Sequence, residues 1–284
     1  MDNVGSRVLV FDSGIGGLSI AAAIWAQLPG SDLVYAGDNA GFPYGDLSEQ
    51  DVVTRCVALV EQALAQYPCD LVVVACNTAS TVVLPTLRSR LAIPVVGVVP
   101  AIKPAAALSL TRRIGVLATP ATVDRPYLES LIDEYAADCT ILRVGSSELV
   151  RLAEAALARD EGVDDEAVRR ILQPLSEGNP DTVVLGCTHF PLIGEALARV
   201  MPGVTHWVDS GEAIARRVVQ LLGEGGEGQG TGLGDCAFLF TARPPSEVAH
   251  WLAANQPEGS GGEPQISRVS LNTARNSNMG SAGL

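Results

Sequence analysis

The sequence has no apolar run of roughly 18 residues or more, the length that a membrane-spanning helix needs. Its first residues also lack the basic start and apolar stretch of a secretory signal. Basic residues are few, since 19 lysines and arginines stand against 32 acidic residues, for a net charge of −13. This charge argues against nucleic acid or an anionic membrane as a partner. We therefore expect a soluble, cytoplasmic protein that binds neither.

The six cysteines form no Cys-x-x-Cys pair and no dense framework. Neither a set of structural disulfides nor a structural zinc site is therefore favoured. For a lone cysteine the default interpretation is a small buried hydrophobic side chain. Four of the six receive that interpretation: Cys56, Cys69, Cys139 and Cys236.

Cys76 and Cys187 stand in matching contexts, each six residues after an aspartate, Asp70 or Asp181, that opens an apolar, β-branched run. Such runs predict buried parallel strands, and ligands bind at the carboxyl ends of such strands. Polar side chains that could bind a carboxylate or tune a thiol follow both cysteines: Asn77, Thr78, Thr188 and His189. We infer two thiols that face one cleft, which suits removal of a proton from one face of a carbon and its return to the other.

Strand and helix signals alternate along the chain and predict an α/β fold with parallel sheets flanked by helices. In the first half, strands are expected at residues 8–11, 33–35, 71–75 and 95–99, and a helix at 48–65. Residues 113–119 resemble residues 7–13 at an offset of 106 (113 − 7 = 106), near the 111 between the two cysteines (187 − 76 = 111). The second half is therefore predicted to be a diverged copy of the first. Asp12 aligns with Ala118, so the two halves are not chemically equal.

The pattern predicts two pseudosymmetric, doubly wound domains with the active site in the cleft between them. The expected first domain, with Asp12 and Cys76, comprises residues 1–99 and 210–255, and the second, with Cys187 and His189, residues 100–209. Composition predicts a flexible glycine-rich loop at 223–235 and a disordered tail at 256–284. Helices are expected at 212–222 and 246–254, and a last strand at 237–241.

An acid and a glycine-rich turn, Asp12 to Gly17, follow the first predicted strand. Backbone N–H groups at the start of the next helix could hold an anion there. A dinucleotide site would need glycine at position 19, where the chain has Ser19, so a cradle for a small carboxylate is preferred. The alternative is a plain tight turn in which Asp12 caps the helix.

Thiols titrate near ~8.5, so modest local effects can poise Cys76 and Cys187 between acid and base. Asp12 near one thiol and His189 near the other could act as proton partners. A zinc site at Cys187 and His189 is not favoured, because further ligands at recognisable spacing are missing. Tyr44 lies in a loop that is either a surface turn or a substrate contact.

Six motifs in order together resemble the glutamate racemases of the bacterial cell-wall pathway. They are residues 12–17, 37–45, 75–80, 115–122, 185–192 and 209–211. The resemblance covers about residues 7–252. It implies racemisation of L- and D-glutamate without a cofactor or metal, by a two-base mechanism, to supply D-glutamate for peptidoglycan.

The resemblance also implies roles for single residues. Cys76 would take the α-proton from D-glutamate and Cys187 from L-glutamate. Asp12 and His189 would assist, and Glu154 aligns with a family acid near the second cysteine, although spacing alone would leave it on a solvated helix face. Substrate would be held by Asp12, Ser13, Tyr44, Gly45, Asn77, Thr78 and Thr188. A homodimer is also expected.

Three alternatives stay open at this point. An aspartate racemase of the same superfamily is the nearest, but its second cysteine motif tends to carry an acid where this chain has His189. The two thiols could instead form a redox couple. The protein could also bind an amino acid without turning it over.

Overall fold

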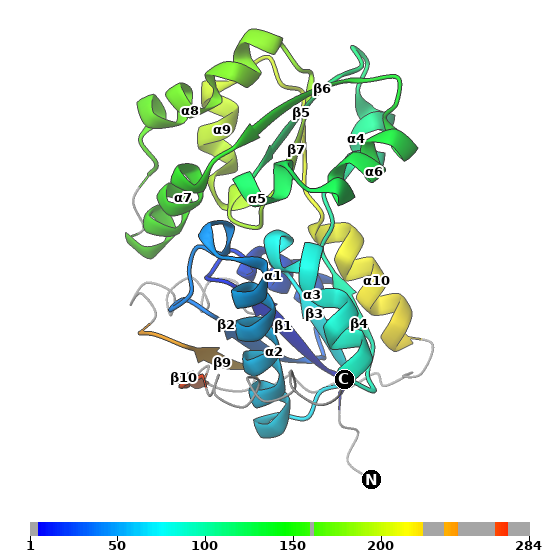
Figure 1. Cartoon of the computed structure of the whole chain (residues 1–284), viewed down its shortest axis with the longest axis vertical. Helices are drawn as coiled ribbons and strands as arrows, with labels where there is room; N and C mark the ends of the chain where they lie inside the picture. The colour runs from blue at the N-terminus through cyan, green and yellow to red at the C-terminus, as the bar shows by residue number, and fades with distance from the viewer. Residues whose placement is uncertain (1–4, 160–161, 224–235, 244–264, 272–284) are drawn as a thin grey trace, which may run out of the picture.

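The computed structural model describes residues 5–159, 162–223, 236–243 and 265–271. Within these residues the chain forms two separate parallel sheets, each flanked by helices (Figure 1). We call the first sheet with its helices lobe 1 and the second sheet with its helices lobe 2. The α/β class predicted from the sequence is confirmed.

Lobe 1 contains a six-stranded sheet in the order β10-β9-β2-β1-β3-β4. Its strands are β1 (Arg7–Asp12), β2 (Asp32–Gly37), β3 (Leu71–Val74), β4 (Val95–Gly97), β9 (Cys236–Phe240) and β10 (Gln265–Arg268). Its helices are α1 (Leu18–Gln27), the 3₁₀ turn η1 (Tyr44–Asp46), α2 (Glu49–Gln66), α3 (Asn77–Arg90) and α10 (Gly211–Gly223).

Lobe 2 contains a four-stranded sheet in the order β6-β5-β7-β8. Its strands are β5 (Arg113–Ala118), β6 (Thr140–Gly145), β7 (Thr182–Gly186) and β8 (His206–Val208). Its helices are α4 (Ile102–Leu108), α5 (Pro120–Val123), α6 (Pro126–Tyr135), α7 (Ser147–Arg159), α8 (Asp165–Gly178), the 3₁₀ turn η2 (Phe190–Ile193) and α9 (Gly194–Val200). None of the described helices is long and apolar enough to cross a membrane.

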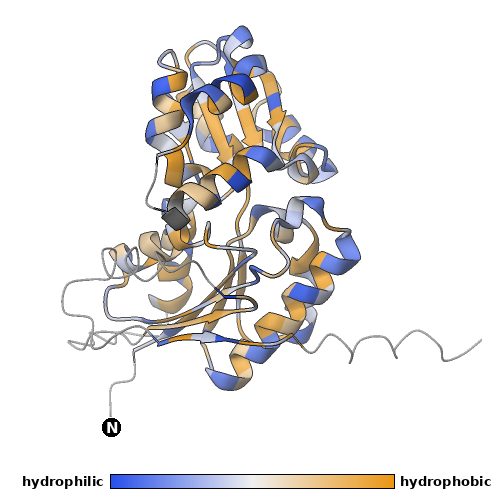
Figure 2. Ribbon diagram, turned by 90° about the vertical axis from the view of Figure 1, so that its left-hand side faces the viewer, coloured by the Kyte–Doolittle hydropathy of each residue, from blue (hydrophilic) through white to orange (hydrophobic). Residues whose placement is uncertain are grey.

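The central strands are buried on both faces, which explains their continuous apolar sequences. In lobe 1, Val8 and Val10 of β1 pack with α1 and α10, whereas Leu9 and Phe11 pack with α2 and α3 on the other face. Lobe 2 repeats this arrangement around β5, with α4 and α6 on one face and α7, α8 and α9 on the other. Figure 2 shows the strands mostly hydrophobic and the helices with hydrophilic residues on their outer surfaces.

The strands and the helix expected in the first half are present, with ends that shift by at most two residues. Ser48 is the N-cap of α2, since its hydroxyl accepts a hydrogen bond from the Asp51 N–H at 3.1 Å. The sequence did not predict β6, which carries the charged Arg143 and, among the described strands, pairs only with β5.

Strand β10 corrects the expectation of a disordered tail from residue 256. Residues 265–268 pair in parallel with β9 at the edge of the lobe 1 sheet. Composition alone missed this strand because its stability comes from the unpaired backbone groups that an edge strand offers, not from its own exposed side chains. The predicted glycine-rich loop beyond Gly223 and the predicted helix at 246–254 lie outside the described residues.

Asp38 connects four parts of lobe 1 through one fully buried carboxylate. Oδ2 accepts from the Tyr44 hydroxyl at 2.7 Å and from Arg55 Nε at 2.6 Å. Oδ1 accepts from Arg55 Nη2 at 2.8 Å and from the Thr241 hydroxyl at 2.6 Å. The end of β2, the η1 turn, α2 and the end of β9 are thereby held together.

We predict that Asp38→Ala lowers the free energy of unfolding by about 3 kcal/mol or more, because it leaves a half-buried guanidinium and a buried hydroxyl without their partner. Glu61→Ala is the matched control, since its ion pair with Arg90 is about 40% exposed on both sides and should change stability by less than ~1 kcal/mol. Urea denaturation of the two variants measures both. Equal transition midpoints would show that Asp38 does not organise the lobe.

Candidate active site

The two cysteines lie at corresponding strand ends of the two lobes. Cys76 follows β3 as the N-cap of α3, where its sulfur accepts from the Ala79 N–H at 3.5 Å. Cys187 directly follows β7. Both are buried, and both line one cavity of about 10 Å³ between the lobes, which has room for about one water molecule.

Cys76 lies in an electrically unfavourable place for a thiolate. Its sulfur is 3.5 Å from the Ser13 hydroxyl. Burial, and next the nearby charge of Asp12, raise the pKa of Cys76 to about 12. At neutral pH this thiol therefore carries its proton.

Asp12 lies behind the cavity wall, fully buried. Its Oδ2 accepts from the Gly14 N–H at 3.0 Å, and its Oδ1 accepts from the Thr188 hydroxyl of lobe 2 at 3.3 Å. Burial raises the pKa of Asp12, against the lowering effect of His189. The carboxylate thus links the Cys76 side of the site to the opposite lobe.

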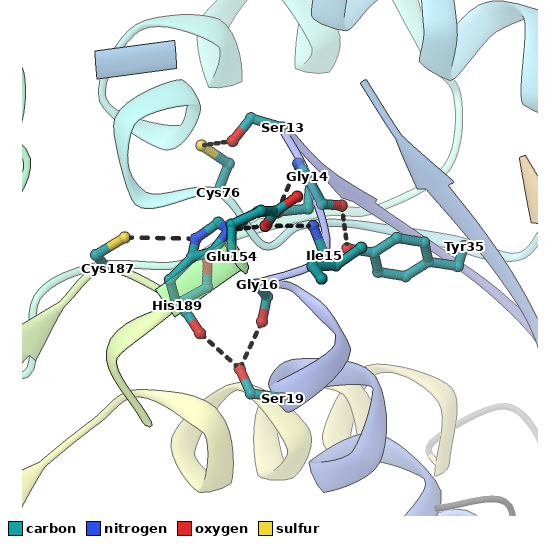
Figure 3. Close-up of polar contacts among 12 residues, drawn as sticks. Ser13, Gly14, Ile15, Gly16, Ser19, Tyr35, Cys76, Glu154, Cys187 and His189 are labelled. Carbon is teal, nitrogen blue, oxygen red and sulfur yellow. Dashed lines mark hydrogen bonds and ion pairs between the residues drawn. The ribbon is translucent and has the colours of Figure 1, made fainter. Parts of the chain in front are cut away.

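A carboxylate and an imidazole stand behind Cys187 (Figure 3). The Cys187 sulfur is 3.7 Å from His189 Nδ1, and His189 Nε2 is 2.5 Å from Glu154 Oε2. Burial lowers the pKa of His189, but the Glu154 charge and the hydrogen bond with Cys187 outweigh burial, so its pKa lies well above the ordinary value. The imidazole thus stands between the Cys187 sulfur and the carboxylate of Glu154.

The glycine-rich turn does not serve as the open carboxylate cradle that the sequence predicted. The Gly14 N–H is bound to Asp12, and the Ile15 N–H donates to Glu154 Oε2 at 3.3 Å. A Cβ at Gly16 would lie only 2.4 Å from His189 Nδ1. The turn therefore holds two carboxylates of the protein itself, and its glycines allow His189 to approach.

Six of the predicted substrate-binding residues line the cavity together with the two cysteines and His189: Ser13, Tyr44, Gly45, Asn77, Thr78 and Thr188. The Asn77 side-chain oxygen is buried and has no hydrogen-bond partner in the described part of the chain. The hydroxyl of Tyr44 instead donates to Asp38, so Tyr44 offers its ring and backbone to the cavity. Asp12 and Glu154 lie behind the wall.

The sequence missed three residues of the cavity wall, Pro43, Thr119 and Val150. Thr119 follows the end of β5, and its hydroxyl is 3.0 Å from that of Thr78 in the opposite lobe. The internal repeat contained a signal for it, because at the offset of 106 Thr119 corresponds to Ser13 (119 − 106 = 13). Val150 lies on α7 and offered no comparable signal.

The chain resembles known proteins over most of its length. A family model described as Asp/Glu/hydantoin racemase matches residues 18–218. The chain is 53% identical over 236 residues to a glutamate racemase of Shewanella loihica (83% of this chain, 87% of the relative) and 56% identical over 217 residues to one of Klebsiella pneumoniae (76% of each).

Solved structures of similar shape carry the same name. Escherichia coli glutamate racemase, solved with L-glutamate and the activator UDP-MurNAc-Ala, matches with a TM-score of 0.85 and 45% identity, covering 94% of this chain and 99% of the other. The isoform RacE1 of Bacillus anthracis matches with a TM-score of 0.78 and 30% identity, covering 94% and 98%.

We predict that Gly16→Ala destabilises the protein by about 1–3 kcal/mol, because the new methyl group displaces His189 from a packed interface. Gly194→Ala provides the control, since a Cβ at Gly194 would have no atom within 4 Å and the residue has helical backbone angles. Thermal and urea unfolding of both variants check this. A Gly16→Ala protein as stable as the control would show that the lobes can separate at this turn without cost.

Proposed function

Because the chain belongs to the Asp/Glu/hydantoin racemase family, we propose that it interconverts L- and D-glutamate with Cys76 and Cys187 as its two bases. The observation that carries the proposal is that two buried thiols from opposite lobes line one cavity, with a different proton partner behind each. The names of the similar glutamate racemases support glutamate as the substrate.

The different surroundings of the two thiols suit a reaction that needs one acid and one base. Cys76 keeps its proton because burial and Asp12 raise its pKa. Cys187 lies beside the imidazole of His189, to which it can pass its proton in order to act as a thiolate. The thiolate takes the α-proton from one face of the substrate and Cys76 donates its proton to the other face, so the configuration inverts. With L-glutamate bound, Cys187 would be the base.

The carbanion formed in this step needs stabilisation where its charge develops, on the α-carbon and the carboxylate oxygens. The first turn of α3 begins at Asn77 beside the cavity, and its N–H groups provide donors for an anion. The unpartnered buried oxygen of Asn77 is an acceptor suited to the substrate ammonium group. These local donors are needed because the net charge of −13 gives no general attraction for an anionic substrate.

The cavity of about 10 Å³ is far too small for an amino acid, so the lobes must separate to admit one. Contacts between the lobes would then break and re-form, including the hydrogen bond from Ser147 of α7 to Asp46 at 2.7 Å and the ion pair of Arg125 with Glu49. Closure around the substrate would exclude water and strengthen the electrostatic interactions inside.

The finer expectations from the sequence stay part of this proposal. They are supply of D-glutamate to peptidoglycan, a cytoplasmic location and a homodimer. Light scattering of the purified protein tests the homodimer.

The first experiment follows the α-proton signal of L-glutamate by NMR in D₂O, with reduced protein and no added cofactor, alongside chiral analysis. We expect loss of the signal together with formation of D-glutamate. Exchange of aspartate but not of glutamate would change the substrate and keep the chemistry. Silence with both amino acids would contradict the proposal and favour a binding or redox protein.

Replacement of either thiol should stop the reaction. We expect Cys76→Ala and Cys187→Ala each to lower kcat by more than about a hundredfold, because each removes a proton-transfer group. Cys69→Ala, at a half-buried cysteine outside the cavity, is the control and should retain wild-type turnover. Racemisation at the wild-type rate by either alanine variant would remove the two-base model, provided circular dichroism shows an intact fold.

A further inference from the structure

Tyr35 is a buried tyrosine of β2 that lies beside the glycine-rich turn (Figure 3). Its ring is fully buried and packs against Phe238 and Phe240, with centroids 6.1 and 5.9 Å away. Its hydroxyl donates to the Gly14 carbonyl at 2.8 Å. A buried hydroxyl needs a partner, and this one finds it in the backbone of the turn rather than in the surrounding core.

The Gly14 carbonyl belongs to the same peptide unit as the Ile15 N–H. Because this unit is planar, a bond that fixes its carbonyl also fixes the direction of its N–H. The N–H donates to Glu154 Oε2 at 3.3 Å, on the side opposite to Tyr35. Hydrogen bonding at the carbonyl also polarises the unit and makes the N–H a better donor.

Neighbouring atoms leave this peptide unit little freedom. A Cβ on Gly37 would lie 2.8 Å from the Gly14 oxygen, and a Cβ on Gly14 would lie 2.9 Å from Glu154 Oε1. The carboxylate of Glu154 therefore rests directly on the turn. Only 15% of the Glu154 side chain is exposed to solvent. Because the carboxylate packs against the turn, its position depends on the position of the turn.

Glu154 in turn is 2.5 Å from His189, whose other ring nitrogen faces Cys187 at 3.7 Å. A continuous series of contacts thus runs from the Tyr35 hydroxyl through one peptide unit, a carboxylate and an imidazole to a thiol. It crosses from lobe 1 to lobe 2, because Tyr35 and the turn belong to one lobe and Glu154, His189 and Cys187 to the other.

We propose that Tyr35 is a positioning residue for the second thiol: its hydroxyl holds the Gly14–Ile15 peptide so that the Ile15 N–H seats Glu154 against His189. The role in turnover rests on the proposed racemase function. The seating of Glu154 is a property of the resting protein and can be measured without turnover.

The burial of Tyr35 keeps its hydroxyl a donor throughout the working pH range. Burial, and then the charges of Asp12 and Glu154, raise the pKa of Tyr35 well above its ordinary value. The residue therefore cannot act as a base, which separates a positioning role from a catalytic one.

Tyr35→Phe removes only the hydroxyl and keeps the ring. We expect kcat/KM to fall about fivefold, the value of one ordinary hydrogen bond. The fall must be equal in the two directions, since L- and D-glutamate have the same free energy. Phe238→Leu, which disturbs the same ring cluster but not the hydrogen bond, should lower stability and leave kcat/KM within about twofold.

The state of His189 provides the direct measurement. The chain has three histidines, at positions 189, 206 and 250, so NMR of ¹⁵N-histidine-labelled protein can follow each imidazole, with His206→Asn and His250→Gln for assignment. Glu154→Gln should lower the pKa of His189, because it removes the charge that raises it. Tyr35→Phe should also lower the pKa of His189, by about half a unit to one unit.

A double-mutant cycle decides between positioning and packing. In the Glu154→Gln background, Tyr35→Phe should have no further effect on kcat/KM or on the His189 titration, because its route through Glu154 is already broken. Gly37→Ala, which crowds the Gly14 oxygen while leaving the hydroxyl in place, should reproduce the Tyr35→Phe shift.

An unchanged His189 titration in a folded Tyr35→Phe protein, or effects that simply add to those of Glu154→Gln, would overturn the proposal. These outcomes are distinct from failure of the proposed function. If the wild-type protein does not racemise glutamate, the racemase assignment falls, while the imidazole titration still tests whether Tyr35 seats Glu154.

Discussion

The close approach of the glycine-rich turn to His189 is the constraint on which the rest of the site depends. With a Cβ at position 16 only 2.4 Å from the imidazole, the two lobes can meet here only if that position carries no side chain. This contact brings the Ile15 N–H to Glu154 and the Thr188 hydroxyl to Asp12. Each lobe therefore donates a hydrogen bond to a carboxylate of the other lobe, and neither half of the site is complete alone.

The two thiols differ because the internal repeat diverged in its surroundings and not in its cysteines. Where lobe 1 has Asp12 at the end of its first strand, lobe 2 has Ala118 at the end of β5. Where lobe 2 has His189 two residues after its cysteine, lobe 1 has Thr78. One thiol consequently lies near a carboxylate that opposes its ionisation, and the other lies 3.7 Å from an imidazole nitrogen. In the proposed two-base reaction, a symmetric site would start with two acids or two bases, and neither state could begin a proton transfer across the substrate.

The parts of the structure that the sequence predicted are those fixed by local chemistry. Strands buried on both faces, such as β3 and β7, are almost entirely apolar, so these strands and the cysteines that follow them can be predicted from the sequence alone. Glu154 was placed by family resemblance alone, since its partners Ile15 and His189 lie 139 and 35 residues away. Val150, β6 and β10 were not predicted for the same reason, because the position of each depends on a neighbour that is distant in the chain. The role of Tyr35 could not be predicted for a different reason. An aromatic residue is ordinary in a buried strand, and the sequence does not indicate what its hydroxyl contacts.

The hydroxyl of Tyr35 helps to keep the charges of Glu154 and His189 in place although the site as a whole is not rigid. Glu154 and His189 must come apart from the turn whenever the lobes separate, since the cavity is too small to admit a substrate otherwise. The hydrogen bond from the Ile15 N–H to Glu154 therefore breaks in every opening. The bond between Tyr35 and Gly14 lies wholly within lobe 1 and survives it. A donor fixed in this way returns the Ile15 N–H to the same direction at each closure, so the carboxylate meets a preorganised partner and the cost of reordering the turn is avoided.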